Sequence, residues 1–291
     1  MRKISVILLL IVVKSNSQVK SIENMPSERF KKGWEKLKEI DGETGEKVIE
    51  NLKDISPDLG VYIIEYAFGD IYSRDGLDLK SKEIAVVAAL TAMANARPQL
   101  KVHLNGALNT GSSVSEIKEV ILQMSVYSGF PGSINAMNAL REVLAERQKQ
   151  GIKDEDGKTA SKINKISRLE SGEKELSKLD NLQVGKLKSA YNDFSPDLAK
   201  FILEYAYGDI FSRDNLEYRY RQIATISALT VLGNAQTQLK FHINAGLNIG
   251  LTDTEIKEIM FLMTIYSGFP SAINGTNVLK EVLSERSKNS K

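Results

Sequence analysis

Apolar positions recur at helical spacing along almost the whole chain. In "LKSKEIAVVAALTAMAN", which begins at Leu79, alanine, leucine and methionine follow one another at intervals of three and four residues. Similar runs begin at Ser56, Arg97, Ser113 and Phe130. We find no stretch whose alternation of apolar and polar residues requires a strand. The pattern therefore predicts an all-α protein.

The helical pattern occurs twice in the chain. The two copies are related by an offset of 139 residues, which is the distance from His103 to His242. "SPDLGVYIIEYAFGDIYSRD" from Ser56 recurs as "SPDLAKFILEYAYGDIFSRD" from Ser195. From residue 56 to residue 147 the register needs no gap, and about half of the positions are identical. A repeat of this length predicts two tandem copies of one domain, with about six helices in each.

The boundaries of the copies follow from composition. We expect a first domain over residues 24–147, a linker over residues 148–162 and a second domain over residues 163–287. The linker, "QKQGIKDEDGKTASK", is polar and charged and contains two glycines, as connecting segments often do. In each domain a capping box begins one helix, with Ser113 and Glu116 in the first and Thr252 and Glu255 in the second.

The first 17 residues differ from the rest of the chain. "MRK" is followed by the apolar run "ISVILLLIVV" and by small residues at Ser15 and Ser17. A basic start, an apolar core and small residues near a cleavage site are typical of a secretory signal peptide. The run is too short to span a bilayer. We therefore expect residues 1–17 to be removed, with the mature protein periplasmic or secreted and not bound to a membrane.

Composition excludes several kinds of chemistry. The chain has no cysteine, which excludes disulfides, thiol redox catalysis and thiolate zinc sites. It contains 39 basic and 37 acidic residues, and the predicted signal peptide carries three of the basic ones and none of the acidic. A mature chain so close to neutral gives no indication of a nucleic-acid partner.

The two histidines are candidate catalytic residues. They begin the phrases "HLNGALNTG" at His103 and "HINAGLNIG" at His242, and the chain has no other histidine. On its helix His103 shares the apolar stripe with Leu100 and Leu104. One interpretation is a partly buried histidine that duplication copied. The other is an acid–base group, because histidine titrates near neutral pH.

Glu83 is a second catalytic candidate. It heads an apolar row of its helix, where burial would raise the pKa of a carboxylate and suit it to acid–base work. The alternative is an exposed glutamate in a first turn, favoured by the helix dipole. The equivalent residue of the second copy is Gln222, which cannot titrate. If Glu83 is catalytic, the first copy alone has the complete pair.

Two further pairs are candidates for binding a substrate. Arg74 and Arg213 follow "GDIYS" and "GDIFS"; each either clamps a carboxylate or, as in Asp70–Arg74, forms an ion pair within its helix. Tyr127 and Tyr266 precede Ser-Gly-Phe-Pro, a sequence that can end one helix and begin the next. Their hydroxyl groups are candidates for the lining of a pocket.

Taken together, these phrases resemble the carboxymuconolactone decarboxylase family. The first copy carries "EYAFGDIYSRDGL", "HLNGALNTG", "EIKEVILQMSVYSGFP" and "NALREVL", and the second carries "EYAYGDIFSRDNL", "HINAGLNIG" and "IYSGFPSAIN". The resemblance covers nearly all of the chain after the predicted signal peptide. It implies an all-helical fold and a ring-like homo-oligomer, most simply a trimer of this duplicated chain.

The resemblance also implies a type of reaction. In the decarboxylase branch a carboxylated lactone loses carbon dioxide, which requires an electron sink at the lactone carbonyl and a proton donor at carbon. His103 and His242 match the family's histidine, and Glu83 matches, within a residue, the acid that precedes it. The alkylhydroperoxidase D-like branch uses a Cys-x-x-Cys pair, and both of its positions lack cysteine in "ARPQLKVH" and "AQTQLKFH".

Three functional hypotheses follow. The first is a lyase or isomerase that needs no cofactor and no metal and acts on a small organic acid or lactone. The second is an exported binding or scaffold protein that kept the fold without the chemistry. The third is an antioxidant protein that works without a cysteine of its own, which the composition disfavours.

Overall fold

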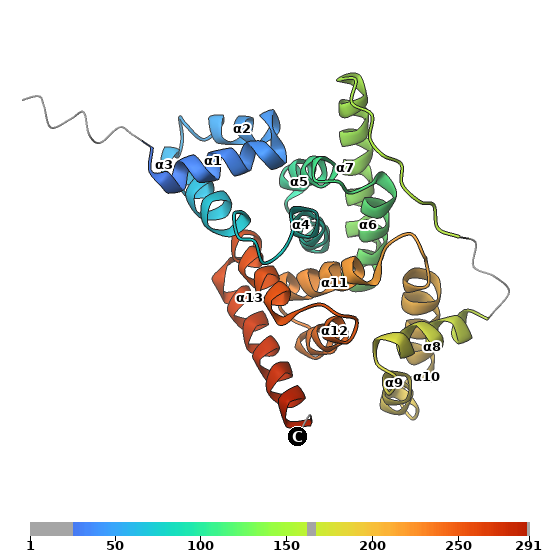
Figure 1. Cartoon of the computed structure of the whole chain (residues 1–291). Coiled ribbons are helices and arrows are strands. Elements are labelled where there is room, and N and C mark those ends of the chain that lie inside the picture. The colour runs from blue at the N-terminus through green and yellow to red at the C-terminus, as the bar shows by residue number, and fades with distance from the viewer. Residues whose placement is uncertain (1–25, 162–166, 290–291) are drawn as a thin grey trace, which may run out of the picture.

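The computed structural model describes residues 26–161 and 167–289, and every regular element within these ranges is a helix (Figure 1). This confirms the predicted all-α fold. The predicted signal peptide, residues 1–17, and the predicted start of the first domain at residue 24 lie outside the described residues. None of the described helices is long and apolar enough to cross a membrane.

The first half of the chain, up to residue 149, contains α1 (Glu28–Asp41), α2 (Glu43–Glu50), α3 (Pro57–Tyr62), η1 (Ile63–Tyr72), α4 (Leu79–Met93), α5 (Arg97–Asn109), α6 (Val114–Ser128) and α7 (Phe130–Lys149). The second half, from residue 167, contains α8 (Arg168–Leu179), α9 (Gln183–Tyr191), α10 (Pro196–Phe201), η2 (Ile202–Phe211), α11 (Tyr218–Leu232), α12 (Gln236–Asn248) and α13 (Asp253–Asn289). Helix α13 is kinked at Gly268, so its two parts correspond to α6 and α7. The two halves thus have the same succession of helices, as the repeat predicts.

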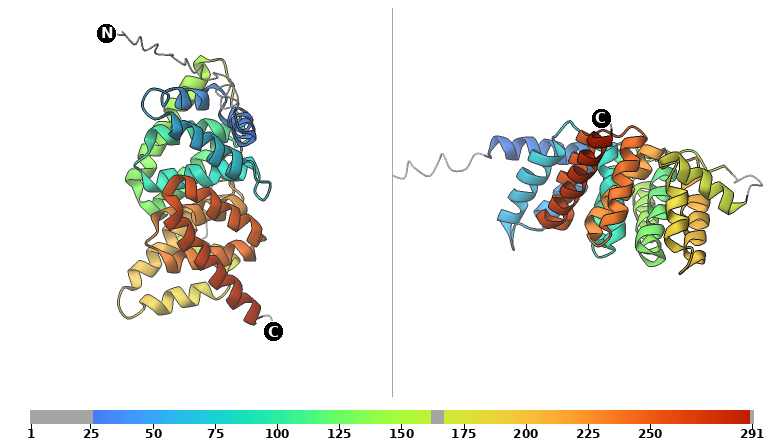
Figure 2. Two further views of the ribbon diagram at one scale, coloured as in Figure 1. Left: turned by 90° about the vertical axis from the view of Figure 1, so that its left-hand side faces the viewer. Right: turned by 90° about the horizontal axis from the view of Figure 1, so that it is seen from below.

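The two equivalent helices α4 and α11 pack against each other at the centre of the molecule (Figure 1). Every residue from Ser81 to Ala92 in α4 is buried, which explains why this segment is apolar on nearly all sides. Seen from the side, the first half lies above the second (Figure 2). One continuous cluster of buried apolar residues includes Leu37 near the start of the chain and Val282 near its end, so the halves share a core.

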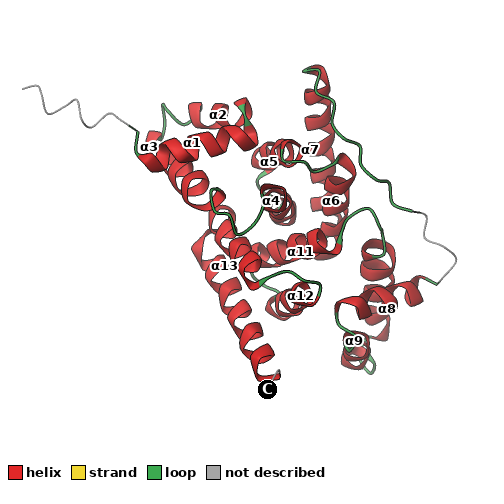
Figure 3. Cartoon of the chain, viewed as in Figure 1, coloured by secondary structure: helices red, strands yellow, loops and turns green. Residues whose placement is uncertain are grey.

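All the regular elements of the described residues are drawn as helices in Figure 3. Among them, a π-helix follows α3 and another follows α10, at equivalent places in the two halves. In each, the last amide bonds a carbonyl five residues back: Ser73 to Phe68 at 3.2 Å, and Ser212 to Tyr207 at 3.0 Å. Helix α1 crosses η1 so closely that a Cβ on Gly33 would lie 1.9 Å from the backbone oxygen of Ile64. Glycine is therefore required there, and it allows α1 to approach η1 this closely.

The first helices of each half also contact the other half. The π-helix η1 packs against α13, and η2 packs against α6. Two hydroxyl pairs repeat at equivalent places, Tyr66 with Thr264 at 2.7 Å and Tyr205 with Ser125 at 2.6 Å. The halves therefore meet through reciprocal contacts, and each contributes side chains to the surroundings of the other.

The segment that joins the halves is held against the start of α6. The backbone amides of Val114 and Ser115 donate to the carbonyl oxygens of Glu155 and Asp156, both at 2.9 Å. These bonds satisfy amides that the first turn of a helix leaves free. The capping boxes predicted at Ser113 and at Thr252 are both present.

Candidate active site

His103 lies between two hydrogen-bond partners in the interior of the first half. It projects from α5 and is 7% exposed. Its Nδ1 lies 3.0 Å from Oε2 of Glu83, which is fully buried on α4, and its Nε2 lies 3.0 Å from the hydroxyl of Tyr266. The Glu83 carboxylate accepts a hydrogen bond from Nδ1–H, and this bond fixes the orientation of the imidazole ring.

The tyrosine at His103 comes from the other half of the chain. Tyr266 lies near the end of the first part of α13, and its hydroxyl also lies 2.8 Å from the hydroxyl of Tyr72, at the end of η1. No pattern in the sequence pairs these residues, because 163 positions separate Tyr266 from His103. The result is a continuous hydrogen-bonded chain from the Glu83 carboxylate through His103 to both tyrosines.

A second buried carboxylate, Asp41, was missed by sequence reasoning. It ends α1, is 4% exposed, and its Oδ1 has no hydrogen-bond partner. A Cβ on Gly106 would lie 2.9 Å from that oxygen and 2.8 Å from Oε2 of Glu83, so the two carboxylates share one narrow space. The available signal was weak: Asp180 lies at the same offset in the second copy, where the repeat is less regular.

Burial and charge shift the pKa values in this cluster. Burial raises the pKa of Asp41 to about 7, and the charge of Glu83 acts in the same direction, whereas His103 opposes it. Burial lowers the pKa of His103, but the charge and hydrogen bond of Glu83 and the charge of Asp41 outweigh it, so the net shift is upward. Two titratable groups whose pKa values are both raised, Asp41 and His103, therefore face one space.

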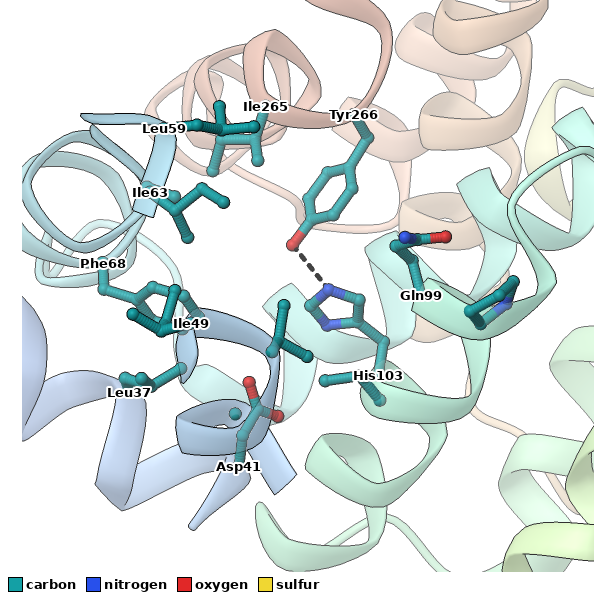
Figure 4. A pocket seen from close by; sticks show the side chains of 15 residues that line it. Leu37, Asp41, Ile49, Leu59, Ile63, Phe68, Gln99, His103, Ile265 and Tyr266 are labelled. Atoms are coloured by element: carbon teal, nitrogen blue, oxygen red, sulfur yellow. Dashed lines mark hydrogen bonds between the residues drawn. The ribbon is translucent and has the colours of Figure 1, made fainter. Parts of the chain in front are cut away.

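This cluster borders a pocket of about 380 Å³, which we call the first pocket. Figure 4 shows the Asp41 carboxyl, the His103 ring and the Tyr266 hydroxyl directed into it. The other labelled side chains are mostly apolar, and among the 15 lining residues there is no lysine or arginine. The apolar lining residues labelled in Figure 4 are Leu37, Ile49, Leu59, Ile63, Phe68 and Ile265. The first pocket thus combines an apolar wall with a small acid–base group.

The equivalent site of the second half has the same geometry but different chemistry. His242 Nδ1 lies 3.0 Å from Oε1 of Gln222, and Nε2 lies 3.2 Å from the hydroxyl of Tyr127, which comes from the first half. Burial lowers the pKa of His242 to about 3, since no carboxylate offsets it. Phe211 stands where the first site has Tyr72, so the second site lacks a counterpart of the Tyr72 hydroxyl.

The structure places the two arginines away from both pockets. Arg74 bonds Glu258 through Nε at 2.8 Å and Nη2 at 2.8 Å, and Arg213 bonds Glu119 in the same way at 2.8 and 2.7 Å. Both glutamates lie in the opposite half, and their side chains are 4% exposed. The expected carboxylate clamps are therefore occupied by the protein's own carboxylates. The alternative Asp70–Arg74 pair is also absent, because Arg29 bonds Asp70.

Comparison with known proteins agrees with this description. The carboxymuconolactone decarboxylase family matches residues 57–142 and 196–281, and the chain belongs to this family. A 4-carboxymuconolactone decarboxylase of Acinetobacter baylyi is 34% identical over 120 residues, which are 41% of this chain and 89% of the relative. A nitrosuccinic acid decarboxylase of Metarhizium robertsii is 32% identical over 89 residues, 31% of this chain and 62% of the relative.

An uncharacterized 15.0 kDa protein of Paracoccus denitrificans is 32% identical over 100 residues, 34% of this chain and 75% of the relative.

Within the described residues no group of three or more His, Cys, Asp or Glu side chains is arranged to hold a metal ion.

The two histidines should titrate very differently. Because the chain has only two, their ring resonances can be followed separately by NMR. We expect His103 to titrate above its ordinary value of 6.5 and His242 to remain neutral between about pH 5 and 8. Glu83→Gln should lower the pKa of His103, and Gln222→Glu should raise that of His242. Equal titration of both rings would contradict this account of the two sites.

Proposed function

We propose that the first half carries the active site of a cofactor-free carboxy-lyase that acts on a small, largely apolar carboxylic acid. The observation that carries the proposal is the placement of His103 on the wall of an apolar pocket, between a buried carboxylate and a tyrosine. Family membership supports decarboxylation as the reaction class, and two relatives are named for decarboxylation of small acids.

The lining of the first pocket favours loss of carbon dioxide. A substrate carboxylate that enters it leaves water for an apolar wall without a lysine or arginine to pair with. As the bond between the carboxylate carbon and the α carbon breaks, its charge spreads into the rest of the molecule and carbon dioxide departs uncharged. The pocket therefore penalises the bound acid more than the transition state.

The remaining steps are a matter of proton transfer. The electron pair left on the α carbon is delocalised into a neighbouring carbonyl of the substrate, and the resulting oxyanion accepts a hydrogen bond from Tyr266. Protonated His103, stabilised by Glu83, then donates its Nε2 proton to the carbon, which completes the exchange of carbon dioxide for hydrogen. Burial raises the pKa of the Tyr266 hydroxyl well above its usual value, so it remains a donor.

Activity should depend on the first site. Carboxylated lactones are the substrates to screen first, and variants are then compared on any that turns over. Glu83→Gln and His103→Asn should each lower kcat/KM by about 10²–10⁴-fold, because each removes a positioned acid–base group. Tyr266→Phe should lower kcat more than it raises KM, since it removes a bond made to the oxyanion.

The second half supplies matched controls for each of these variants. His242→Asn and Tyr127→Phe remove the equivalent groups and should leave kcat/KM within about threefold of the parent. Gln222→Glu should leave it unchanged or raise it. Equal losses from His103→Asn and His242→Asn, with Glu83→Gln unaffected, would contradict the assignment. Bound acid with no turnover of any substrate would support the non-catalytic binding protein instead.

The pH profile should report Asp41. In its protonated form Asp41 can donate to the substrate carboxylate, whereas its ionised form repels it. Because its pKa is about 7, kcat/KM should fall as the pH rises through 7, and deprotonation of His103 adds to the fall. Asp41→Asn keeps a donor that does not titrate, so His103 alone should then govern the decrease. In this variant kcat/KM should fall by about tenfold per pH unit, less steeply than in the parent. An unchanged profile would exclude Asp41 from this role.

We also propose that the protein is a homo-oligomer. Large apolar residues are exposed at equivalent places in both halves, with Phe130 60% and Phe269 59% exposed. Three further equivalent pairs are also exposed in both halves: Leu59 and Leu198, Tyr62 and Phe201, and Ile134 and Ile273. A patch repeated on both halves suits contact with further copies of the same chain. Light scattering should give a multiple of the chain mass, and Phe130→Glu with Phe269→Glu should reduce it to one chain.

Export remains a proposal that rests on residues 1–17, namely the basic start, the apolar run and the small residues that follow it. N-terminal sequencing of the protein from its native cell should begin near residue 18. Recovery of intact Met1 on the soluble protein would contradict it.

A further inference from the structure

The second half contains a pocket of about 410 Å³ at the equivalent place, which we call the second pocket. His242 lies at its base, and Leu176, Ile202 and Phe241 form apolar walls. Its size is therefore similar to that of the first pocket, within the range that small ligands occupy. Its polar groups, however, are different.

Helix α9 gives the second pocket its polar side. It contributes Gln183, Lys186 and Tyr191, and α12 contributes Thr237 and Gln238. No lysine or arginine lines the first pocket, and Pro98 stands in it at the position of Thr237. Lys186, two amides and the hydroxyl groups of Tyr191 and Thr237 therefore border a space whose counterpart is mainly apolar.

The carboxylate that faces the first pocket does not line the second. Asp180, the counterpart of Asp41, accepts a hydrogen bond from the amide of Leu182 at 2.9 Å and lies 3.6 Å from Lys186. Lys186 is 60% exposed on its side chain, and the long contact with Asp180 is weaker than a close hydrogen-bonded pair. The ammonium group is thus available to an anion at the mouth of the second pocket.

His242 of the second pocket cannot exchange protons as His103 of the first pocket can. His242 donates from Nδ1 to the amide oxygen of Gln222, and its Nε2 accepts from Tyr127. Without a carboxylate partner the imidazole stays neutral at ordinary pH. The second pocket therefore offers a cation, hydrogen bonds and apolar walls, but no acid–base pair.

We propose that the second pocket is a separate, non-catalytic binding site for a small carboxylate with a hydroxylated, ring-sized body. The carboxylate pairs with Lys186 at the mouth, the ring lies between Leu176 and Phe241, and the amides bond its hydroxyl groups. A single ammonium group suits one carboxylate better than a more highly charged phosphate. This inference goes beyond the proposed reaction and does not require the first site to be active.

The test follows the ring resonances of the two histidines while 4-hydroxybenzoate is added to the full chain. Because each pocket contains one histidine, the spectrum reports which pocket is occupied. We expect a saturable shift of the His242 resonances, with binding tighter than about 1 mM. The uncharged analogue 4-hydroxybenzamide should bind about five- to tenfold more weakly.

Lys186→Met should weaken binding at His242 by the same factor, because it removes the charge and keeps an apolar stem. Lys47→Met is the matched control: Lys47 occupies the equivalent position of α2, does not line the first pocket, and should leave binding unchanged. Unmoved His242 resonances, or equal affinity in Lys186→Met and the parent, would overturn the proposal. Consumption of the bound acid by the His103→Asn variant would also overturn it, because the second pocket would then be catalytic. Failure of the proposed reaction is a different result, since it appears only as absent turnover at the first site.

Discussion

A buried imidazole needs a hydrogen-bond partner on each nitrogen, and in this protein neither half can supply both. His103 obtains one partner from its own half and the other, Tyr266, from the opposite half; His242 and Tyr127 repeat the arrangement. Burying either ring with one nitrogen unpaired would cost about 1–3 kcal/mol. The shared core, the packing of α4 on α11 and the crossing of η1 onto α13 all serve to keep these partners in place.

The two sites differ in chemistry because a carboxylate in the first copy is replaced by an amide in the second. Glu83 and Gln222 have nearly the same shape, and both lie 3.0 Å from a histidine Nδ1. Burial lowers the pKa of both histidines. At His103 the Glu83 carboxylate stabilises the positive ring and makes the net shift upward, whereas at His242 the Gln222 amide does not offset the burial. The exchange of Glu83 for Gln222 thus keeps the distance to the histidine and makes the second site neutral where the first one titrates.

The same reciprocity explains the arginines. Arg74 and Arg213 each form a bidentate pair with a buried glutamate of the opposite half. Removing Arg74 would leave the buried Glu258 carboxylate without this partner, which costs far more than a surface ion pair gains. If Arg213 were removed, Glu119 would keep a longer contact with Arg221 at 3.4 Å. The identical placement of Arg74 and Arg213 after "GDIYS" and "GDIFS" is therefore accounted for by the contact between the halves.

The sequence by itself determined the helical fold, the duplication and the capping boxes, because these depend on spacing along one helix or on a fixed offset. The pairing of His103 with Glu83 rested instead on the resemblance to the family, since the two residues lie on different helices. The sequence also showed that Gln222 replaces Glu83. Only the tertiary structure decided which tyrosine serves which histidine, which carboxylate each arginine binds, and that Asp41 faces the first pocket. Those contacts join residues far apart in the chain, and periodicity carries no information about which distant side chains burial will bring together.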